Sequence, residues 1–219
     1  MRKFILCAIV FVVVWSCTTR KEQSEAGAVS QDTIHSDSAG IREAAVAVNF
    51  PLDSLLSFQS EEALKNIFGA NVKRSTGYYP EGMGEYQNTL LFPGTRNEVE
   101  FVWEDDTVAF KGLAYIQVDG EQTDWKTKEG ITLGTRLKEL EKLNQKPFTF
   151  SGFGWDYGGI ASWDDGHLEA RKITVGLEYP DETMPQEFDD LLGDHDIKSN
   201  SDLAQKANPV VVRITMNPL

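Results

Sequence analysis

The stretch Glu98-Val99-Glu100-Phe101-Val102-Trp103 alternates between acidic and large apolar side chains over most of its length. Successive side chains of a β-strand point to opposite faces, so the apolar residues at positions 99, 101 and 103 would share one face. The two glutamates would lie largely on the other face. This pattern predicts a strand with one apolar face, and therefore a sheet to which that strand belongs.

Similar segments lie on both sides of this stretch. Residues 86–92 end at Pro93-Gly94, and residues 113–118 end at Asp119-Gly120. An Asp-Gly step favours a tight turn because positive φ angles are required there. Strands joined by such short links run antiparallel. Further strands are expected at residues 148–153, 159–163, 167–179 and 210–216, with a turn at Asp164-Asp165-Gly166.

Two segments have the spacing of helices. Ser60 is a candidate N-cap, and the stripe Leu64, Ile67 and Phe68 ends at Gly69. The second helix is expected from about Thr135 until Pro147 stops it, with charged residues on one side and four leucines on the other, at positions 133, 137, 140 and 143. A weaker helical candidate covers residues 187–192.

The order of one helix followed by several strands occurs twice, over residues 52–118 and 133–216. We therefore expect an α+β domain in which two helices pack on one face of an antiparallel sheet. A degenerate tandem repeat of this unit is an open alternative. The order of elements is similar to that of the β-lactamase-inhibitor protein and of small outer-membrane assembly lipoproteins. A resemblance of element order implies nothing about function.

The N-terminus has the features of an export signal. Arg2 and Lys3 precede an apolar run of 12 residues, from position 4 to position 15. A bilayer-spanning helix needs roughly 20 residues, whereas the core of a signal peptide has about 7 to 15. The sequence Val14-Trp15-Ser16-Cys17 resembles the lipobox of bacterial lipoproteins, in the relaxed form seen in the Bacteroidetes. The resemblance implies that residues 1–16 are removed and that Cys17 is acylated with palmitate-like chains.

An ordinary signal peptide with a chance cysteine is the alternative. If Cys17 carries two or more acyl chains, its membrane attachment is stable. Cys7 would leave with the signal peptide, so no cysteine would remain for a disulfide, a metal site or a nucleophile. The mature chain would hold 19 basic and 34 acidic residues, a formal net charge of −15. Such a body repels nucleic acids and anionic headgroups, and neither is an expected partner.

Residues 17–45 read as the lipidated cysteine followed by a flexible tether, because they are rich in Ser, Thr, Gln, Glu and Gly and poor in large apolar side chains. His35 lies in this segment and is expected to be inert. Residues 46–219 have the length of a single domain, which buries enough surface to fold without a disulfide.

The most distinctive sequences are Gly130-Ile131-Thr132-Leu133-Gly134-Thr135 and Gly152-Phe153-Gly154-Trp155-Asp156-Tyr157-Gly158-Gly159. Together with residues 140–148, they resemble a family of uncharacterised exported bacterial proteins over most of residues 60–217. The resemblance implies a folded domain and supplies no activity or site residues.

The glycine-aromatic segment 152–159 has two interpretations. In one, its glycines allow a bulged or sharply twisted strand pair, and its aromatic rings cover the sheet. In the other, Trp155, Tyr157 and Trp163 form a ligand patch in which Asp156 accepts a hydrogen bond. The spacing does not match a phosphate-binding loop.

The sequence contains no recognisable catalytic constellation. His167 and His195 are the only histidines of the expected domain, and no zinc-hydrolase, serine-hydrolase or Ser-x-x-Lys motif is present. The segment around His195 contains four aspartates, Asp189, Asp190, Asp194 and Asp196. Their spacing is not that of a calcium loop, so the segment is expected to be solvated, and weak calcium binding is the alternative. No cofactor or metal site is expected.

These features predict a membrane-anchored envelope lipoprotein with a non-catalytic domain, structural or binding another envelope protein. A carbohydrate-binding module or glycan hydrolase that uses the aromatic patch near Trp155 is the alternative. Thr18 follows Cys17 where an aspartate could stand, and in this the sequence resembles lipoproteins that are sent to an outer membrane. The segment that follows lacks the acidic run that resembles a surface-export signal, so the periplasmic side is the predicted location.

Overall fold

The alternating stretch that begins at residue 98 forms a central strand of a four-stranded antiparallel meander. The computed structural model describes residues 49–79 and 82–218. In β3, Val99 and Phe101 are fully buried and Trp103 is almost so, as the alternation predicts. The meander consists of β1 (Val72–Tyr78), β2 (Glu85–Leu91), β3 (Val99–Asp105) and β4 (Lys111–Asp119).

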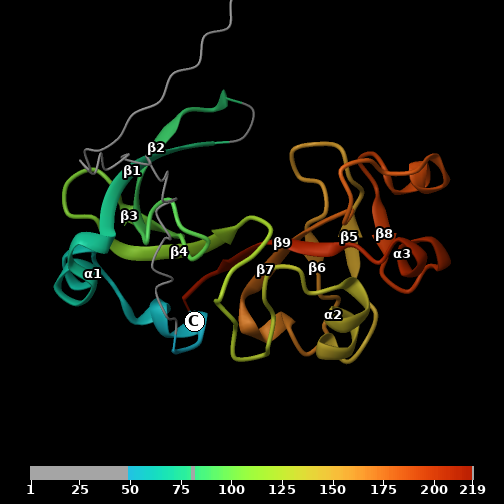
Figure 1. Cartoon of the computed structure of the whole chain (residues 1–219), viewed down its shortest axis with the longest axis horizontal. Coiled ribbons are helices and arrows are strands. Elements are labelled where there is room, and N and C mark those ends of the chain that lie inside the picture. Colours follow the sequence, from blue (N-terminus) through green and yellow to red (C-terminus); the bar gives the residue numbers. More distant parts are fainter. Residues whose placement is uncertain (1–48, 80–81, 219) are drawn as a thin grey trace, which may run out of the picture. The chain divides into compact units, whose positions relative to one another are not determined.

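Two strands from the C-terminal half extend this meander to six strands. β9 (Val210–Met216) pairs antiparallel with β4 and with β7 (Ile173–Glu178), giving the order β1-β2-β3-β4-β9-β7. β9 aligns Ile214 with Val118 of β4 and with Val175 of β7. The antiparallel sheet and the α+β class are as predicted, and Figure 1 shows how β9 links the two halves of the chain.

A second, smaller sheet lies beside β7 and was not expected. It has the order β6-β5-β8 and consists of β5 (Thr149–Ser151), β6 (Ala161–Ser162) and β8 (Asp196–Lys198). Two of its strands fall within predicted segments but are much shorter. The two halves of the chain both place a helix before strands, but the first half forms one meander whereas the second half divides its strands between two sheets.

The predicted long strand at residues 167–179 is wrong over its first part. The 3₁₀ helix η4 (Glu169–Arg171) occupies that part, and β7 begins only at Ile173. The buried side chain of Asn144 explains the difference, because its Oδ1 accepts a hydrogen bond from the backbone N–H of Leu168 at 3.1 Å. The predicted turn at Asp164-Asp165-Gly166 is present, since the backbone N–H of Gly166 donates to the carbonyl of Trp163 at 2.9 Å. The turn does not join two paired strands, because β6 and β7 belong to different sheets.

The helices begin and end for local reasons. In α1 (Glu61–Phe68), the hydroxyl of Ser60 accepts the backbone N–H of Ala63 at 3.2 Å, and Gly69 ends the helix with a φ of 55°. Both residues were predicted in these roles. α2 (Leu137–Asn144) starts slightly later than expected, and the left-handed conformation of Gln145 ends it before the predicted stop at Pro147.

Four further short helical segments lie in the described part of the chain. α3 (Asp202–Ala207) begins at Ser201, whose hydroxyl accepts the backbone N–H of Ala204 at 3.3 Å. The weak candidate near residue 187 is the 3₁₀ helix η5 (Gln186–Leu191), and η1 (Leu52–Ser57) and η2 (Gly69–Asn71) flank α1.

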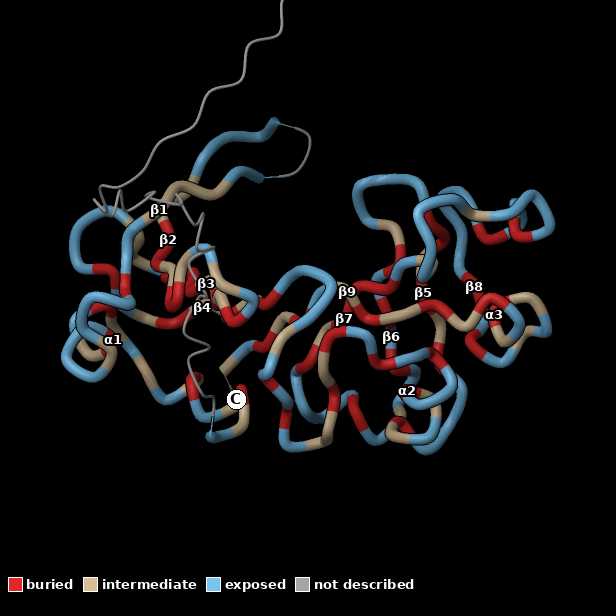
Figure 2. The backbone as a smooth tube through the Cα atoms, in the orientation of Figure 1, coloured by how far each residue is buried: buried red, intermediate tan, exposed pale blue. Residues whose placement is uncertain are grey.

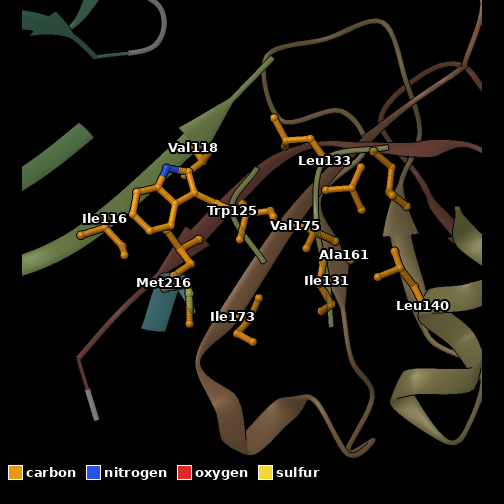
Figure 3. Packing of buried hydrophobic residues seen from close by; sticks show 14 of the residues in the cluster. Ile116, Val118, Trp125, Ile131, Leu133, Leu140, Ala161, Ile173, Val175 and Met216 are labelled. Atoms are coloured by element: carbon orange, nitrogen blue, oxygen red, sulfur yellow. The ribbon is translucent and has the colours of Figure 1, made fainter. Parts of the chain in front are cut away.

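One continuous apolar cluster holds the described part of the chain together. It joins Leu64 of α1 and Leu140 of α2 to strands of both sheets. Figure 3 shows the part around Trp125, with Ile116 of β4 and Met216 of β9. Figure 2 shows buried positions along the strands, whereas the connecting turns are exposed.

The predicted signal peptide (1–16), Cys17 and the tether (17–45) lie outside the described residues. No helix in the described part of the chain combines the length and the apolar composition that crossing a bilayer requires.

Candidate ligand-binding groove

The glycines of segment 152–159 allow close packing between backbone segments. A Cβ on Gly159 would lie 1.9 Å from the carbonyl oxygen of Leu177 in β7, and one on Gly152 would lie 2.4 Å from that of Gly193. The N–H of Leu177 donates to the carbonyl of Gly159 at 2.9 Å. The segment therefore joins the small sheet to β7, which agrees with the interpretation of the glycines as structural.

The tip of this segment presents two aromatic side chains to solvent. The backbone N–H of Gly158 donates to the carbonyl of Trp155 at 2.9 Å and closes a turn. The indole N–H of Trp155 donates to the carbonyl of Gly152 at 2.7 Å, so the ring is held in place. Trp155 and Tyr157 are 37% and 39% exposed, and their ring centroids are 5.5 Å apart at an interplanar angle of 66°.

Trp163 is not part of this exposed pair, which contradicts its place in the ligand-patch interpretation. It is only 4% exposed, and its indole N–H donates to the carbonyl of Ile173 at 2.6 Å. Its ring packs edge-on against Phe148 at 5.1 Å. Trp163 therefore belongs to the core, because Ile173 of β7 supplies its hydrogen-bond acceptor and Phe148, just before β5, packs against its ring.

Trp155 and Asp156 line an open groove with a volume of about 520 Å³, here called the Trp155 groove. One wall is residues 153–156 with Gly158, and the other comes from the end of β7 and the chain after it, including Tyr179 and Met184. Four carboxylates line it, and none has a hydrogen bond or ion pair with another described side chain: Asp156, Glu178, Asp181 and Glu182.

The groove thus combines apolar aromatic surface with four negative charges. Among the described residues, no histidine, serine, threonine or cysteine lines it. The sequence pattern indicated the wall that contains Trp155. It did not indicate the acidic wall, because residues 178–182 follow a strand and have no motif of their own. Their proximity to Trp155 depends on the contact between Gly159 and Leu177.

The acidic residues around His195 are divided between η5, the loop that follows it and β8. The ring Nε2 of His195 lies 3.1 Å from the carbonyl oxygen of Asp190, and Asp196 begins β8. Within residues 49–79 and 82–218, no three His, Cys, Asp or Glu side chains are placed to hold a metal ion together.

A polar cluster on the six-stranded sheet has no counterpart in a local sequence pattern. Glu100 of β3 accepts the hydroxyl of Tyr86 at 2.9 Å and the amide of Asn88. Burial, reinforced by the hydrogen bond to Glu100, raises the pKa of the Tyr86 hydroxyl far above its ordinary value. These residues come from paired strands and lie 12 and 14 positions apart, so no local pattern connects them.

No family model matches this chain, and no curated protein matches it. Among solved structures, it is similar to the uncharacterized protein yfeY from Escherichia coli, with 13% sequence identity and a TM-score of 0.34. The similarity covers 72% of this chain and 88% of that chain. At this level of structural agreement, the similarity carries no information about ligand or activity.

Proposed function

We propose that this protein is an exported lipoprotein, anchored in the outer membrane through Cys17, whose domain binds another envelope protein on the periplasmic side without catalysis. The Trp155 groove is the proposed contact surface. The single observation that carries the proposal is that the exposed ring of Trp155 lines one groove together with four carboxylates that have no partner among the described residues.

The composition of the groove supports a basic protein segment as its partner. Tyr and Trp are enriched where proteins contact one another, since each contributes a large apolar area and loses little conformational freedom. A Lys or Arg side chain gains from the carboxylates and from the face of an aromatic ring. The acidic body of the domain attracts such a segment from a distance.

The ring geometry favours a protein partner over a carbohydrate. Trp155 and Tyr157 meet at 66°, so together they do not form the flat platform that would stack on consecutive sugar rings. The carboxylates would accept hydrogen bonds from sugar hydroxyls, but four negative charges without a basic lining residue favour a cationic ligand.

Crosslinking in intact cells tests the proposed partner. The full chain is compared with the double variant Trp155→Ala, Tyr157→Ala, and with Tyr78→Ala, which removes a 70% exposed aromatic residue of β1. We expect the unchanged chain and Tyr78→Ala to capture a basic envelope protein, and the double variant to lose it. Added salt should weaken the complex. Equal capture by all three proteins would contradict the proposal.

Two further measurements test the anchor and the alternative ligand. Mass spectrometry of the native N-terminus should find acyl chains on Cys17, and Cys17→Ser should release the protein from the outer-membrane fraction. A tryptophan fluorescence titration with peptidoglycan fragments and polysaccharides should give no response. A saturable response lost in Trp155→Ala would instead favour the carbohydrate function.

A further inference from the structure

The six-stranded sheet ends at β1, and the outer edge of this strand is open. Among the described strands, β1 pairs with β2 alone. Just beyond one end of this pair, the N–H of Tyr79 donates to the carbonyl of Gly84 at 3.0 Å. Since hydrogen-bonded and non-hydrogen-bonded pairs alternate, the odd-numbered residues of β1 bond to β2. The even-numbered residues direct their backbone N–H and C=O groups outward: Val72, Arg74, Thr76 and Tyr78.

The outer half of the β1–β2 hairpin lacks a third strand. The pairing with β1 covers residues 85–91 of β2, whereas the pairing with β3 covers only residues 88–91. Figure 1 shows the end of this hairpin projecting beyond β3. A ribbon of two strands is marginally stable in water, and an added strand stabilises it. On the β3 side, the N–H of Gln87 is already bound by Asp106 at 3.1 Å, so the open edge of β1 is the place for that strand.

The charges of β1 restrict what can pair with it. Neither a proline nor a bulge interrupts the strand, so its backbone can accept another strand. The guanidinium of Arg74 is held by the carboxylate of Glu61 at 2.8 Å. The exposed ammonium of Lys73 has no ion pair with a described residue. Like charges directly opposite each other destabilise a strand pair. A partner strand must therefore place no cation opposite Lys73 or Arg74.

A second copy of β1 meets this condition in one antiparallel register. Pairing centred on Ser75 puts Val72 opposite Tyr78 of the second copy and Arg74 opposite Thr76. Each outward-facing residue then exchanges hydrogen bonds with another outward-facing residue. A register centred on Arg74 would place the two guanidiniums opposite each other. A register centred on Thr76 would leave Val72 without a partner in β1. The centre at Ser75 is therefore the favoured one.

The side chains on one face of β1 also match in this register. Lys73 stands opposite Gly77 of the second copy. The ring of Tyr86 lies over Gly77, since an added Cβ there would collide with it. The hydroxyl of Tyr86 donates to the carboxylate of Glu100 at 2.9 Å. The ammonium of Lys73 thus meets an aromatic ring with a carboxylate beside it, a combination that attracts a cation. Because each copy carries both the cation and the ring, the edge is complementary to itself.

We propose that two copies of this chain associate through β1 and join their six-stranded sheets into one continuous antiparallel sheet. The pairing has two-fold symmetry, so both copies contribute the same residues. β7, whose end lines the Trp155 groove, is the other edge strand of the sheet. The dimer therefore leaves that groove free and does not depend on the partner proposed for it.

Disulfide crosslinking of the purified full chain in detergent tests the register. In the dimer the two copies of Ser75 form a non-hydrogen-bonded pair with Cα atoms about 4.5 Å apart, which suits a disulfide. Ser75→Cys should therefore give mainly covalent dimer after mild oxidation, seen on a non-reducing gel. Tyr78→Cys is the control, because Tyr78 is 70% exposed but lies at opposite ends of the paired strands in the two copies. The unchanged chain, with Cys7 and Cys17, gives the background. No covalent dimer of Ser75→Cys, or as much of Tyr78→Cys, would overturn the proposal.

A proline at position 76 tests the backbone hydrogen bonds. Thr76→Pro removes an N–H that points outward and leaves the bonds to β2 in place. Thr76→Ala is the matched control, since it also removes the hydroxyl that accepts the amide of Gln87 but keeps the N–H. In sedimentation velocity, Thr76→Pro should raise the dissociation constant of the dimer by about tenfold or more, and Thr76→Ala by less than about threefold. Circular dichroism confirms that both variants are folded. Unchanged dimerisation of folded Thr76→Pro, or an unchanged chain that is monomeric at about 100 μM, would show that β1 is not the interface.

Discussion

The carboxylate of Glu61, the first residue of α1, accepts hydrogen bonds from Nε and Nη2 of Arg74 in β1, at 3.0 and 2.8 Å from its Oε2. Glu61 is only 4% exposed and also pairs with Lys65 at 3.0 Å. The guanidinium of Arg74 lies 3.7 Å from the ring centroid of Phe110. One buried carboxylate thus connects α1 to the edge strand of the six-stranded sheet.

Replacing Glu61 tests how much this connection contributes to stability. Glu61→Gln keeps the size of the side chain but removes the charge that Arg74 and Lys65 share. Both cations are about half exposed, so we expect a loss of only about 1 to 2 kcal/mol in the free energy of unfolding, measured by urea denaturation. Glu62→Gln, on the exposed side of the same turn, is the control and should change stability by less than about 0.5 kcal/mol.

The same ion pair predicts a pH dependence. Burial raises the pKa of Glu61, but the hydrogen bonds from Arg74 and Lys65 outweigh burial, and the pKa lies below its ordinary value of 4.5. A carboxyl whose pKa is lowered by folding contributes stability above its unfolded pKa and loses it as the pH falls through the folded value. The stability difference between the unchanged protein and Glu61→Gln should therefore be constant near neutral pH and shrink below pH 4.5. A difference that grows on acidification would contradict this assignment.

Gly159 is expected to tolerate no side chain. Gly159→Ala requires a Cβ 1.9 Å from the Leu177 carbonyl oxygen, at a φ of 74°. Gly134→Ala is the matched control, since its φ is 82° but no atom lies within 4 Å of the added Cβ. We expect the free energy of unfolding, measured by chemical denaturation, to fall by about 3 kcal/mol or more in Gly159→Ala and by about 1 kcal/mol in Gly134→Ala. Equal losses would mean that only the backbone conformation matters.

Replacing Trp163 or Trp155 by alanine should lower the stability of the protein to different extents. Trp163→Ala removes a buried ring and a hydrogen bond to Ile173, and it should lower the free energy of unfolding by about 3 to 5 kcal/mol. Trp155→Ala removes a partly exposed ring and should lower it by about 1 kcal/mol. Thermal and urea unfolding of both variants would check the order, and a larger loss for Trp155 would contradict the placement of Trp163 in the core.

Local patterns predicted a large part of the fold. The Ser60 cap and the Gly69 stop of α1 depend on neighbouring backbone groups, so four or five consecutive residues contain the required information. The same holds for β9, which covers the predicted residues 210–216. The predicted strand over residues 167–179 failed where Asn144, more than twenty positions away, binds the backbone of Leu168.

The sequence by itself determined the acidic character of the chain and its α+β class, because composition and short-range periodicity are properties of neighbouring residues. Only the tertiary structure decided that Trp163 is buried, that Asp181 and Glu182 lie opposite Trp155, and that Glu129 meets Arg171. Each of these contacts joins segments that are distant along the chain. Their proximity results from the pairing of β7 with β9 and from the close approach of Gly159 to Leu177, and no spacing of residues within one segment encodes it.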